Sequence, residues 1–381
     1  MAQEGPSSWP PRLDLADGAV RLAPYGLFQL DAGTTFGQER PGGGVNLRRL
    51  RLGVEATVRE DWEAALIWEF GGTPGSRSRL YQASLAWSGL EPFTLTAGVF
   101  KPRFSLEETQ SSADTLFLER AAIVGLVSGL AAGSRRTGGQ VQAHGERWLA
   151  AASLTGPRTG PGEDSRQRGA NLRLAGLPVA GGDLLVHLGL SATWVLRAPR
   201  SEGDPDLTLS ERPELVLDRS EPVLSTGTIR AGRARAGGVE AGLGWRGLWV
   251  QGEIYGIELD REEGPGRLRF SGGYVQAAWT LLGQPRRWEP GRAAWGAPKP
   301  AGDFRPAAGQ WGALEVGARF SAVNLNDAEI RGGRQRIWTA GLGWWPAEPL
   351  RLLVQYQYGE ISGGENDRNF HALALRAQVA F

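Results

Sequence analysis

Several residue types that build enzyme centres are absent or scarce in this sequence of 381 residues. Cysteine is absent, which excludes disulfides, thiolate zinc sites, iron–sulfur clusters and cysteine nucleophiles. The histidines, His144, His187 and His371, lie far apart, so a histidine-rich metal site is not expected. No serine–histidine motif and no phosphate-binding glycine loop with a following lysine occurs. We therefore expect no catalytic residue, no metal and no cofactor.

Lysine is also scarce, and the charges nearly cancel. All but two of the 42 basic residues are arginine, the exceptions being Lys101 and Lys299, and 41 acidic residues bring the net charge to +1. A nucleic-acid-binding protein should have a strongly basic surface. We therefore expect no nucleic-acid partner.

Long hydrophobic runs are missing as well. The mean hydropathy is −0.28, and the longest weakly polar run, residues 121–133, is shorter than the about 20 apolar residues that a membrane-spanning helix needs. Residues 1–6 lack the basic and apolar regions of a signal peptide, so an exported protein would be represented here by its mature form. A soluble protein and an outer-membrane β-barrel are both compatible with this composition.

The sequence does contain a regular alternation of apolar and polar residues with period two. Leu50 and Leu52 alternate with Arg49 and Arg51, and the closing residues 370–381 repeat the pattern. A β-strand turns consecutive side chains to opposite faces, so each such segment has one apolar and one polar face. In a closed sheet with an apolar outside, Arg49 and Arg51 would point into the lumen.

About sixteen segments share this alternation, and the connections between them alternate in length. Short turns such as 59–61 and 145–147 follow one strand, and long polar connections such as 102–135 follow the next. Up-and-down outer-membrane barrels have short periplasmic turns and long external loops. We expect an all-β, antiparallel transmembrane barrel of 16 strands over residues 20–381, preceded by a periplasmic segment of residues 1–19. The expected strands are 20–33, 46–58, 62–70, 80–88, 93–101, 136–144, 147–155, 168–176, 183–195, 234–245, 247–257, 267–282, 311–320, 335–345, 350–358 and 370–381.

Aromatic residues flank the short turns, and charges occupy the face opposite the apolar positions. Trp62, Trp148 and Trp245 stand where an aromatic girdle at one membrane interface would require them. Charges such as Arg173 and Glu240 fall on the other strand face, where burial without a partner in a dry core would be too costly. That face is therefore expected to line water in a hollow barrel.

Specific blocks of sequence resemble one known family. Residues 99–112 and 115–120 resemble a strand end and the third loop of the phosphate-selective porins O and P of Gram-negative outer membranes, and residues 46–55 are similar to an early hairpin of that family. The resemblance covers nearly the whole chain and is weakest at 196–233 and 283–310. It implies a sixteen-stranded porin, usually a homotrimer in outer-membrane lipid.

The resemblance also implies a function and a site. Small anionic or polar solutes, with phosphate or other oxyanions among the candidates, would diffuse passively through an arginine-lined lumen that the loop at about 102–135 narrows. Arginine suits oxyanions because its fork donates two parallel hydrogen bonds, and serine hydroxyls can replace part of an anion's hydration. The candidate constriction and anion-binding residues are Arg49, Arg51, Ser111, Ser112, Arg120, Arg230, Arg233 and Arg235.

Three points stay open at this stage. Arg233 and Arg235, two residues apart, would form a short ladder of charges or belong to an ordinary solvated loop. The basic stretch 283–310 lies on the short-turn side by strand count, and either folds into the pore or shows that the count has lost a strand pair. Phosphate-specific members of the family use a lysine cluster deep in the pore, and two lysines are too few to predict phosphate specificity.

A soluble all-β carbohydrate-active enzyme or binding protein is the alternative. The adjacent acids Glu107 and Glu108 could suggest glycoside hydrolysis, although adjacent loop acids are usually solvated. The polar strand faces and the asymmetric connections favour the porin of the Gram-negative outer membrane.

Overall fold

Long antiparallel strands make up most of the protein. The computed structural model describes residues 12–37, 42–133, 135–159, 166–201, 204–218, 222–262, 264, 266–364 and 367–381. Within these residues, no helix has the length and apolar character needed to cross a membrane. Of the expected N-terminal segment 1–19, residues 1–11 lie outside the described residues, and β1 (Leu13–Leu15) pairs with the start of the first long strand.

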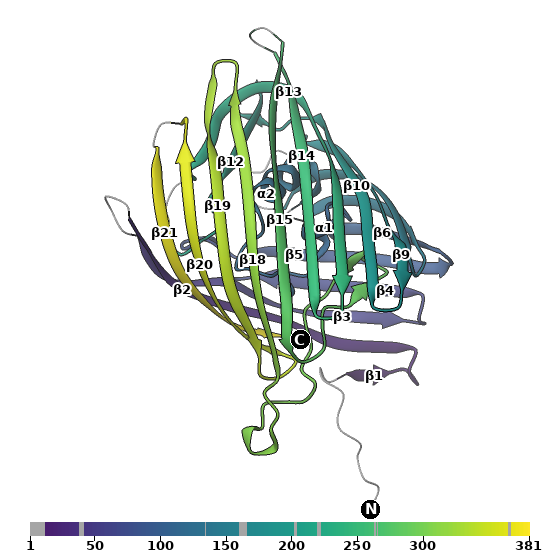
Figure 1. The fold of residues 1–381 in the computed structure, drawn as a ribbon. Helices are drawn as coiled ribbons and strands as arrows, with labels where there is room; N and C mark the ends of the chain where they lie inside the picture. Colours follow the sequence, from purple (N-terminus) through teal and green to yellow (C-terminus); the bar gives the residue numbers. More distant parts are fainter. Residues whose placement is uncertain are drawn as a thin grey trace, which may run out of the picture.

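Sixteen strands close into a barrel (Figure 1). Each pairs antiparallel with its neighbours, and the last strand closes the ring on the first, with Phe28 opposite Val379. The predicted barrel and all sixteen predicted segments are confirmed. The barrel strands are β2 (Val20–Phe36), β3 (Gly43–Val58), β4 (Trp62–Glu69), β5 (Arg79–Leu90), β6 (Phe93–Phe100), β7 (Arg136–His144), β8 (Trp148–Arg158), β9 (Arg168–Gly181), β10 (Leu184–Arg197), β13 (Leu224–Trp245), β14 (Leu248–Arg261), β15 (Arg267–Leu282), β18 (Ala313–Asp327), β19 (Ile330–Trp345), β20 (Leu350–Ser362) and β21 (Arg368–Ala380).

The remaining elements lie in the connections. The connection between β6 and β7 contains two short helices and a π-helical turn, and the connection between β10 and β13 contains two further strands. A small hairpin and a 3₁₀ turn lie between β15 and β18. These elements are α1 (Leu106–Thr109), α2 (Ala122–Val127), η1 (Ser128–Ala132), β11 (Arg200–Ser201), β12 (Asp204–Glu211), β16 (Trp288–Glu289), β17 (Ala294–Trp295) and η2 (Pro306–Ala308).

The strands at the long-loop rim are longer than the sequence pattern indicates. Residues 321–334 were expected to be a loop, but β18 and β19 continue until only Ala328 and Glu329 lie between them. Outside the lipid, both faces of a strand contact water or protein. The sequence there no longer alternates between apolar and polar residues, although the backbone hydrogen bonds between the strands continue. The barrel thus has a tall wall around β13, with 22 residues, and a short wall where β4 and β6 have eight each.

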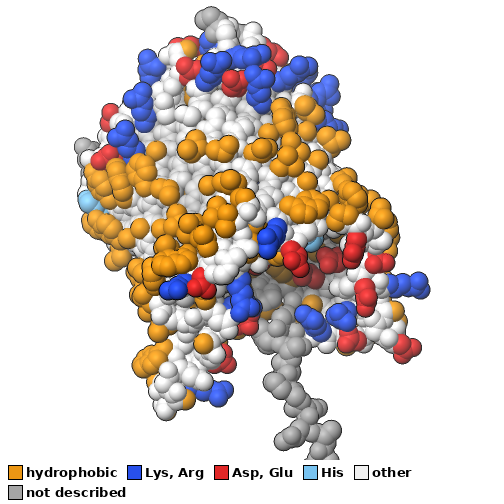
Figure 2. Space-filling view, turned by 45° about the vertical axis from the view of Figure 1, so that its right-hand side comes forward, with side chains coloured by type: hydrophobic (Ala, Val, Ile, Leu, Met, Phe, Trp, Pro, Cys, Tyr) orange, Lys and Arg blue, Asp and Glu red, His pale blue; other side chains and the backbone are white. Residues whose placement is uncertain are grey.

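The outward face of the barrel is apolar. Val239, Ile254 and Val275 are exposed in the middle of the tall wall, and Trp62 and Trp148 are exposed beside the short turns, as the predicted girdle requires. Figure 2 shows the resulting hydrophobic zone with charged side chains above and below it. An apolar band of this extent suits lipid and does not suit the soluble alternative.

The inward face differs from the water-lined surface that was expected. Arg173, Glu240, Arg319 and Arg376 are each at most 3% exposed. They escape the cost of isolated burial because they form ion pairs and hydrogen bonds with one another and with segments that fold into the barrel. The prediction that this face lines water was therefore wrong for these four positions, although open space remains elsewhere in the barrel. That prediction assumed that these charged side chains would have no partners in a dry interior. Their partners come from segments that are distant in the sequence.

Candidate channel constriction

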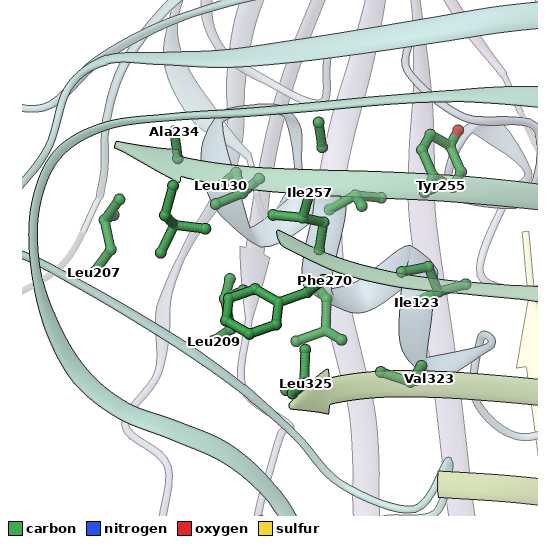
Figure 3. Packing of buried hydrophobic residues seen from close by; sticks show 14 of the residues in the cluster. Ile123, Leu130, Leu207, Leu209, Ala234, Tyr255, Ile257, Phe270, Val323 and Leu325 are labelled. Atoms are coloured by element: carbon green, nitrogen blue, oxygen red, sulfur yellow. The ribbon is translucent and has the colours of Figure 1, made fainter. Parts of the chain in front are cut away.

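Residues 101–135 leave the end of β6 and turn into the barrel. Their apolar side chains pack against the inward faces of β14, β15 and β18 in one buried cluster. Figure 3 shows Ile123 and Leu130 of this segment beside Ile257, Phe270 and Val323 of the wall. The infolded segment therefore fills the lumen on the side of the tall wall. Inward-facing glycines allow the close approach, because a Cβ on Gly317 would lie 2.9 Å from Leu116.

The start of the infolded segment is held by one carboxylate. Glu253 of β14 accepts hydrogen bonds from the backbone N–H groups of Leu106 (2.7 Å) and Glu107 (3.0 Å) and from the hydroxyl of Ser105 (3.0 Å). The N–H groups of a helix's first turn have no partner within the helix, so a buried start such as that of α1 needs an acceptor from elsewhere. The hydroxyls of Tyr255 and Tyr274 also donate to Glu253.

Wall arginines hold the middle of the same segment through its carbonyl groups. Arg351 donates to the carbonyls of Thr115 (2.6 Å) and Leu116 (2.8 Å). Arg376 donates to the carbonyl of Leu118 (2.7 Å) while its other nitrogens pair with Asp31 at 2.6 and 2.7 Å. These buried arginines thus serve to position the segment.

Two further segments enter the barrel, and the sequence did not place either securely. Glu214, from the connection between β10 and β13, binds Arg319 at 2.5 Å and accepts from the backbone N–H of Ala122 at 2.8 Å. The hairpin β16–β17 enters from the short-turn side, where Arg173 donates to the carbonyls of Arg292 (2.7 Å) and Ala293 (2.8 Å). The strand count had therefore lost no pair, and part of 283–310 does fold into the barrel.

Two chambers lie inside the barrel along the short wall. The chamber toward the short turns has a volume of about 720 Å³ and is lined by Glu63 and His144, and the chamber toward the long loops has about 340 Å³ and is lined by Arg158 and Glu211. Five residues line both chambers and therefore surround the neck between them. These neck residues are Arg51, Tyr81, Lys101, Ser112 and Arg135.

The neck carries three cations with different degrees of charge compensation. The guanidinium carbons of Arg51 and Arg135 each lie 3.7 Å from the ring centroid of Tyr81, so both cations stack on this ring. Arg51 pairs with Glu69 at 2.6 Å and donates to the Ser112 hydroxyl at 3.2 Å. Lys101 lies 3.8 Å from Glu108. Arg135 forms no ion pair with a carboxylate among the described residues, so its charge is the least compensated of the three.

Basic side chains outnumber acidic ones in both chambers when the three neck cations are counted with each; without them, the chamber toward the short turns has two of each kind, and the chamber toward the long loops has six basic and five acidic residues. The chamber toward the short turns is lined by five basic and two acidic residues, and the chamber toward the long loops by nine and five. A narrow, charged lumen with low-dielectric walls concentrates ions of the opposite sign. The excess of positive charge therefore lies mainly at the neck, where it favours anions.

The structure brings some of the predicted site residues together. Arg51 and Ser112 lie at the neck, and Ser111 lines the chamber toward the short turns. Arg49 and Arg120 line the other chamber, where Arg49 pairs with Glu119 at 3.1 Å. Arg120 donates to the carbonyls of Glu107 (2.9 Å) and Gln110 (2.8 Å), so it also fixes the infolded segment.

The structure does not bring Arg230, Arg233 and Arg235 to this site. Their side chains are exposed on the outward face of β13, and the inward positions beside them are held by Ala234 and Ala236, which pack on the infolded segment. The expected arginine ladder therefore does not face the lumen. Register shifts in β13 beside Ala231 and near Thr228 change which residues face inward, and alternation alone does not reveal such bulges.

Sequence reasoning missed three neck residues, Tyr81, Lys101 and Arg135. Lys101 stands inside the block that resembles the porin loop, and it is one of only two lysines, so its position was the available signal. Arg135 is the last residue before β7 and Tyr81 lies on β5. Nothing in their local sequence distinguishes them from other polar residues at strand ends.

Replacing Glu253 by glutamine should loosen the infolded segment. The amide keeps the shape of the side chain but cannot accept all the hydrogen bonds that the carboxylate accepts, and each unsatisfied buried donor costs about 1–3 kcal/mol. We expect larger and noisier single-channel currents in planar bilayers. Glu63→Gln, a lumenal carboxylate that is exposed in the chamber toward the short turns, is the matched control. Equal noise in both variants would show that Glu253 does not hold the segment.

Glu211 should make ion selectivity depend on pH. Burial, together with the nearby charges of Glu119 and Glu214 and against the opposing effect of Arg212, raises the pKa of Glu211 to about 7. Above this pH the carboxylate adds a negative charge to the chamber toward the long loops, and below it the group is neutral. Anion preference, measured as reversal potential in a KCl gradient, should therefore increase as the pH falls through 7. In Glu211→Gln this step should be absent, and an unchanged step would assign it to another group.

Comparisons with known proteins agree with this geometry. The family model described as phosphate-selective porin O and P matches residues 25–381. The chain is 27% identical over 379 residues to an uncharacterized protein of Caulobacter vibrioides, covering 94% of this chain and 71% of that protein, and 21% identical over 370 residues to Porin O of Pseudomonas aeruginosa, covering 88% and 81%. An anion-selective porin from Comamonas acidovorans has the same fold, with a TM-score of 0.57, 11% identity, and coverage of 95% of this chain and 100% of that chain. The chain therefore belongs to the phosphate-selective porin O and P family.

Proposed function

We propose that this outer-membrane porin prefers anions and passes small oxyanions, phosphate among them, by passive diffusion and without a catalytic step. Solutes would move through the two chambers, and the neck would set the selectivity. The observation that carries the proposal is that Arg135, at the neck, forms no ion pair among the described residues, because a cation already paired with a carboxylate attracts a passing anion only weakly.

The chemistry of the neck supports an oxyanion as the preferred solute. The Arg135 fork can donate two hydrogen bonds, and the Ser112 hydroxyl and the Lys101 ammonium stand at the same narrowing to replace water around the anion. Conduction requires that each site bind weakly enough to release its ion. Arg103 in the next chamber, which donates to Gln142 (3.1 Å), offers a site to which the anion can pass.

Arginine takes the larger part in this recognition. Lys101 lies at the neck, whereas Lys299 is half exposed near the short-turn end and pairs with Glu348. A lysine cluster of the kind expected in phosphate-specific family members therefore does not form, since these are the only lysines. We infer a preference for oxyanions as a class, with phosphate as one member, in place of strict phosphate specificity.

Arg135→Gln should lower the anion preference of the channel. The substitution removes the least compensated charge at the neck, so the chloride-to-potassium permeability ratio from reversal potentials should fall, and block of chloride current by added phosphate should weaken. Arg135→Lys should keep most of the anion selectivity but little of the block by phosphate. Lysine has the positive charge but lacks the two parallel N–H donors of the guanidinium group. Arg246→Gln, which removes an exposed charge beside a short turn, is the control. Unchanged selectivity in Arg135→Gln would overturn the proposal.

We also propose that three copies of the chain associate through the short wall. A transmembrane strand needs about 9–11 residues to cross the lipid, and β4 and β6 have eight each. Their outward side chains include Leu66 and Trp68, both well exposed in the single chain. The strands of this wall are too short to cross the lipid, yet their outward side chains are apolar. Such a surface is suited to contact with another protein chain.

The association can be tested by light scattering on the protein in detergent. The wild type should have the mass of three chains, and Leu66→Arg, which adds a charge to the short wall, should dissociate into single chains. Thr228→Arg adds the same charge at an exposed position of the tall wall and should leave the mass unchanged. A wild type that runs as a single chain would rule the trimer out.

A further inference from the structure

We infer that the outer wall of the barrel binds a lipid phosphate group of the outer leaflet, at the rim formed by β13, β14 and β15. Two of its four arginines, Arg233 and Arg235, are ones that the sequence pattern suggested for the pore and that the fold turns outward. It lies on the tall wall, away from the short wall that is proposed to contact other copies. The inference requires only that the tall wall faces lipid.

Four arginines from two strands frame two carboxylates of the strand between them. Across the sheet, Arg235 of β13 stands opposite Glu258 of β14, which stands opposite Arg269 of β15. One row farther toward the long loops, the same pairing joins Arg233, Asp260 and Arg267.

The two carboxylates are already occupied, so a net positive charge remains. Glu258 pairs with Arg235 and, at 3.2 Å, with Arg269, while Asp260 pairs with Arg267 at 2.7 Å. Arg269 is still 73% exposed at its side chain, and Arg233 forms no ion pair within the described residues. Asp327 of β18 adds a third carboxylate, which accepts from the backbone N–H of Arg269 at 2.7 Å. Four cations against three anions leave a net positive charge and free guanidinium donors for a further negative group.

The rows stand directly above the apolar band. Two residues farther along the strands, below Arg235 and Glu258, come Gly237 and Gly256, and two residues beyond these come Val239 (62% exposed) and Ile254 (66% exposed). Figure 2 shows basic side chains gathered along the upper rim over the hydrophobic zone, with acidic side chains among them. The four arginines therefore stand at the boundary between lipid and polar surroundings.

A trough on the outer surface connects the arginines with the apolar band. It has a volume of about 540 Å³ and is lined by Trp194, Arg235, Gly237, Gly256, Glu258 and Arg269, among others. A Cβ on Gly256 would meet no atom within 4 Å, so the absence of side chains at this point opens the surface. An acyl chain could lie in the trough while its phosphate reaches the arginines.

These features favour a phosphate that is attached to a lipid over a free ion. Arginine forks bind phosphate oxygens in pairs, and tryptophan, here Trp194, commonly lies at the level of lipid headgroups. Exposed charges alone are screened by salt and bind free ions weakly. The trough and the apolar residues below it add contacts that only an amphiphile can use.

The test uses the purified full chain in detergent, with diphosphorylated lipid A as the probe and native mass spectrometry as the readout. The variant is Arg235→Gln combined with Arg269→Gln. The loss of two interfacial arginines should weaken lipid A binding by about 30-fold. The matched control is Arg21→Gln combined with Arg246→Gln, which removes two exposed, ion-paired arginines at the short-turn end and should bind like the wild type.

Further experiments distinguish lipid-attached phosphate from free phosphate and show whether a loss of binding is due to misfolding. Gly256→Leu keeps every charge but fills the trough, and it should weaken lipid A binding while single-channel selectivity stays that of the wild type. Dephosphorylated lipid A should bind weakly to the wild type, and inorganic phosphate should not displace lipid A. Equal binding of lipid A by the double arginine variant, an equal loss in the control, or displacement by inorganic phosphate would each overturn the inference.

Discussion

The channel depends on one recurring interaction, in which charged side chains of the barrel wall bind the backbone polar groups of segments folded into the lumen. A segment inside a barrel has no neighbouring strand to satisfy its N–H and C=O groups, and a charged wall without partners would pay the cost of burial. Glu253 accepts from the start of α1, and Arg351 and Arg376 donate to carbonyls farther along the same segment. Removing one member of such a buried pair leaves the other charge unsatisfied, at a cost of about 3–5 kcal/mol.

This interaction also decides where the channel runs. The infolded segment packs against the tall wall through the apolar cluster around Ile123, so the free space is displaced to the side of β3 to β7. Most wall arginines on the filled side are used to hold backbone. The cations that remain beside the open path, above all Arg135, are those whose charge a passing solute can meet. The arginines that hold backbone and those beside the open path thus differ in their partners and not in their residue type.

Strand β13 shows how one element serves two surroundings. Its inward residues Ala234 and Ala236 are small and pack on the infolded segment, while Arg233 and Arg235 lie on the outer surface at the boundary of the apolar band. The bulges beside Ala231 and near Thr228 set this phase. A shift of one residue would turn the arginines toward the apolar cluster and expose the alanines, so the register of a single strand decides whether these arginines face the lumen or the outer surface.

The sequence by itself determined the barrel. Period-two alternation, short turns alternating with long connections, and tryptophans beside the turns depend on neighbouring residues only, and they located all sixteen strands. It also placed Arg51 and Ser112 correctly near the narrowing, because strand phase and a specific block of sequence carried that information. Tertiary structure alone decided which charges are compensated. Arg376 pairs with Asp31 at the other end of the chain and Arg319 with Glu214, whereas Arg135 has no carboxylate within ion-pair distance in the part of the chain that the structure describes. Such pairings join residues that are distant in sequence, so no local pattern can encode them.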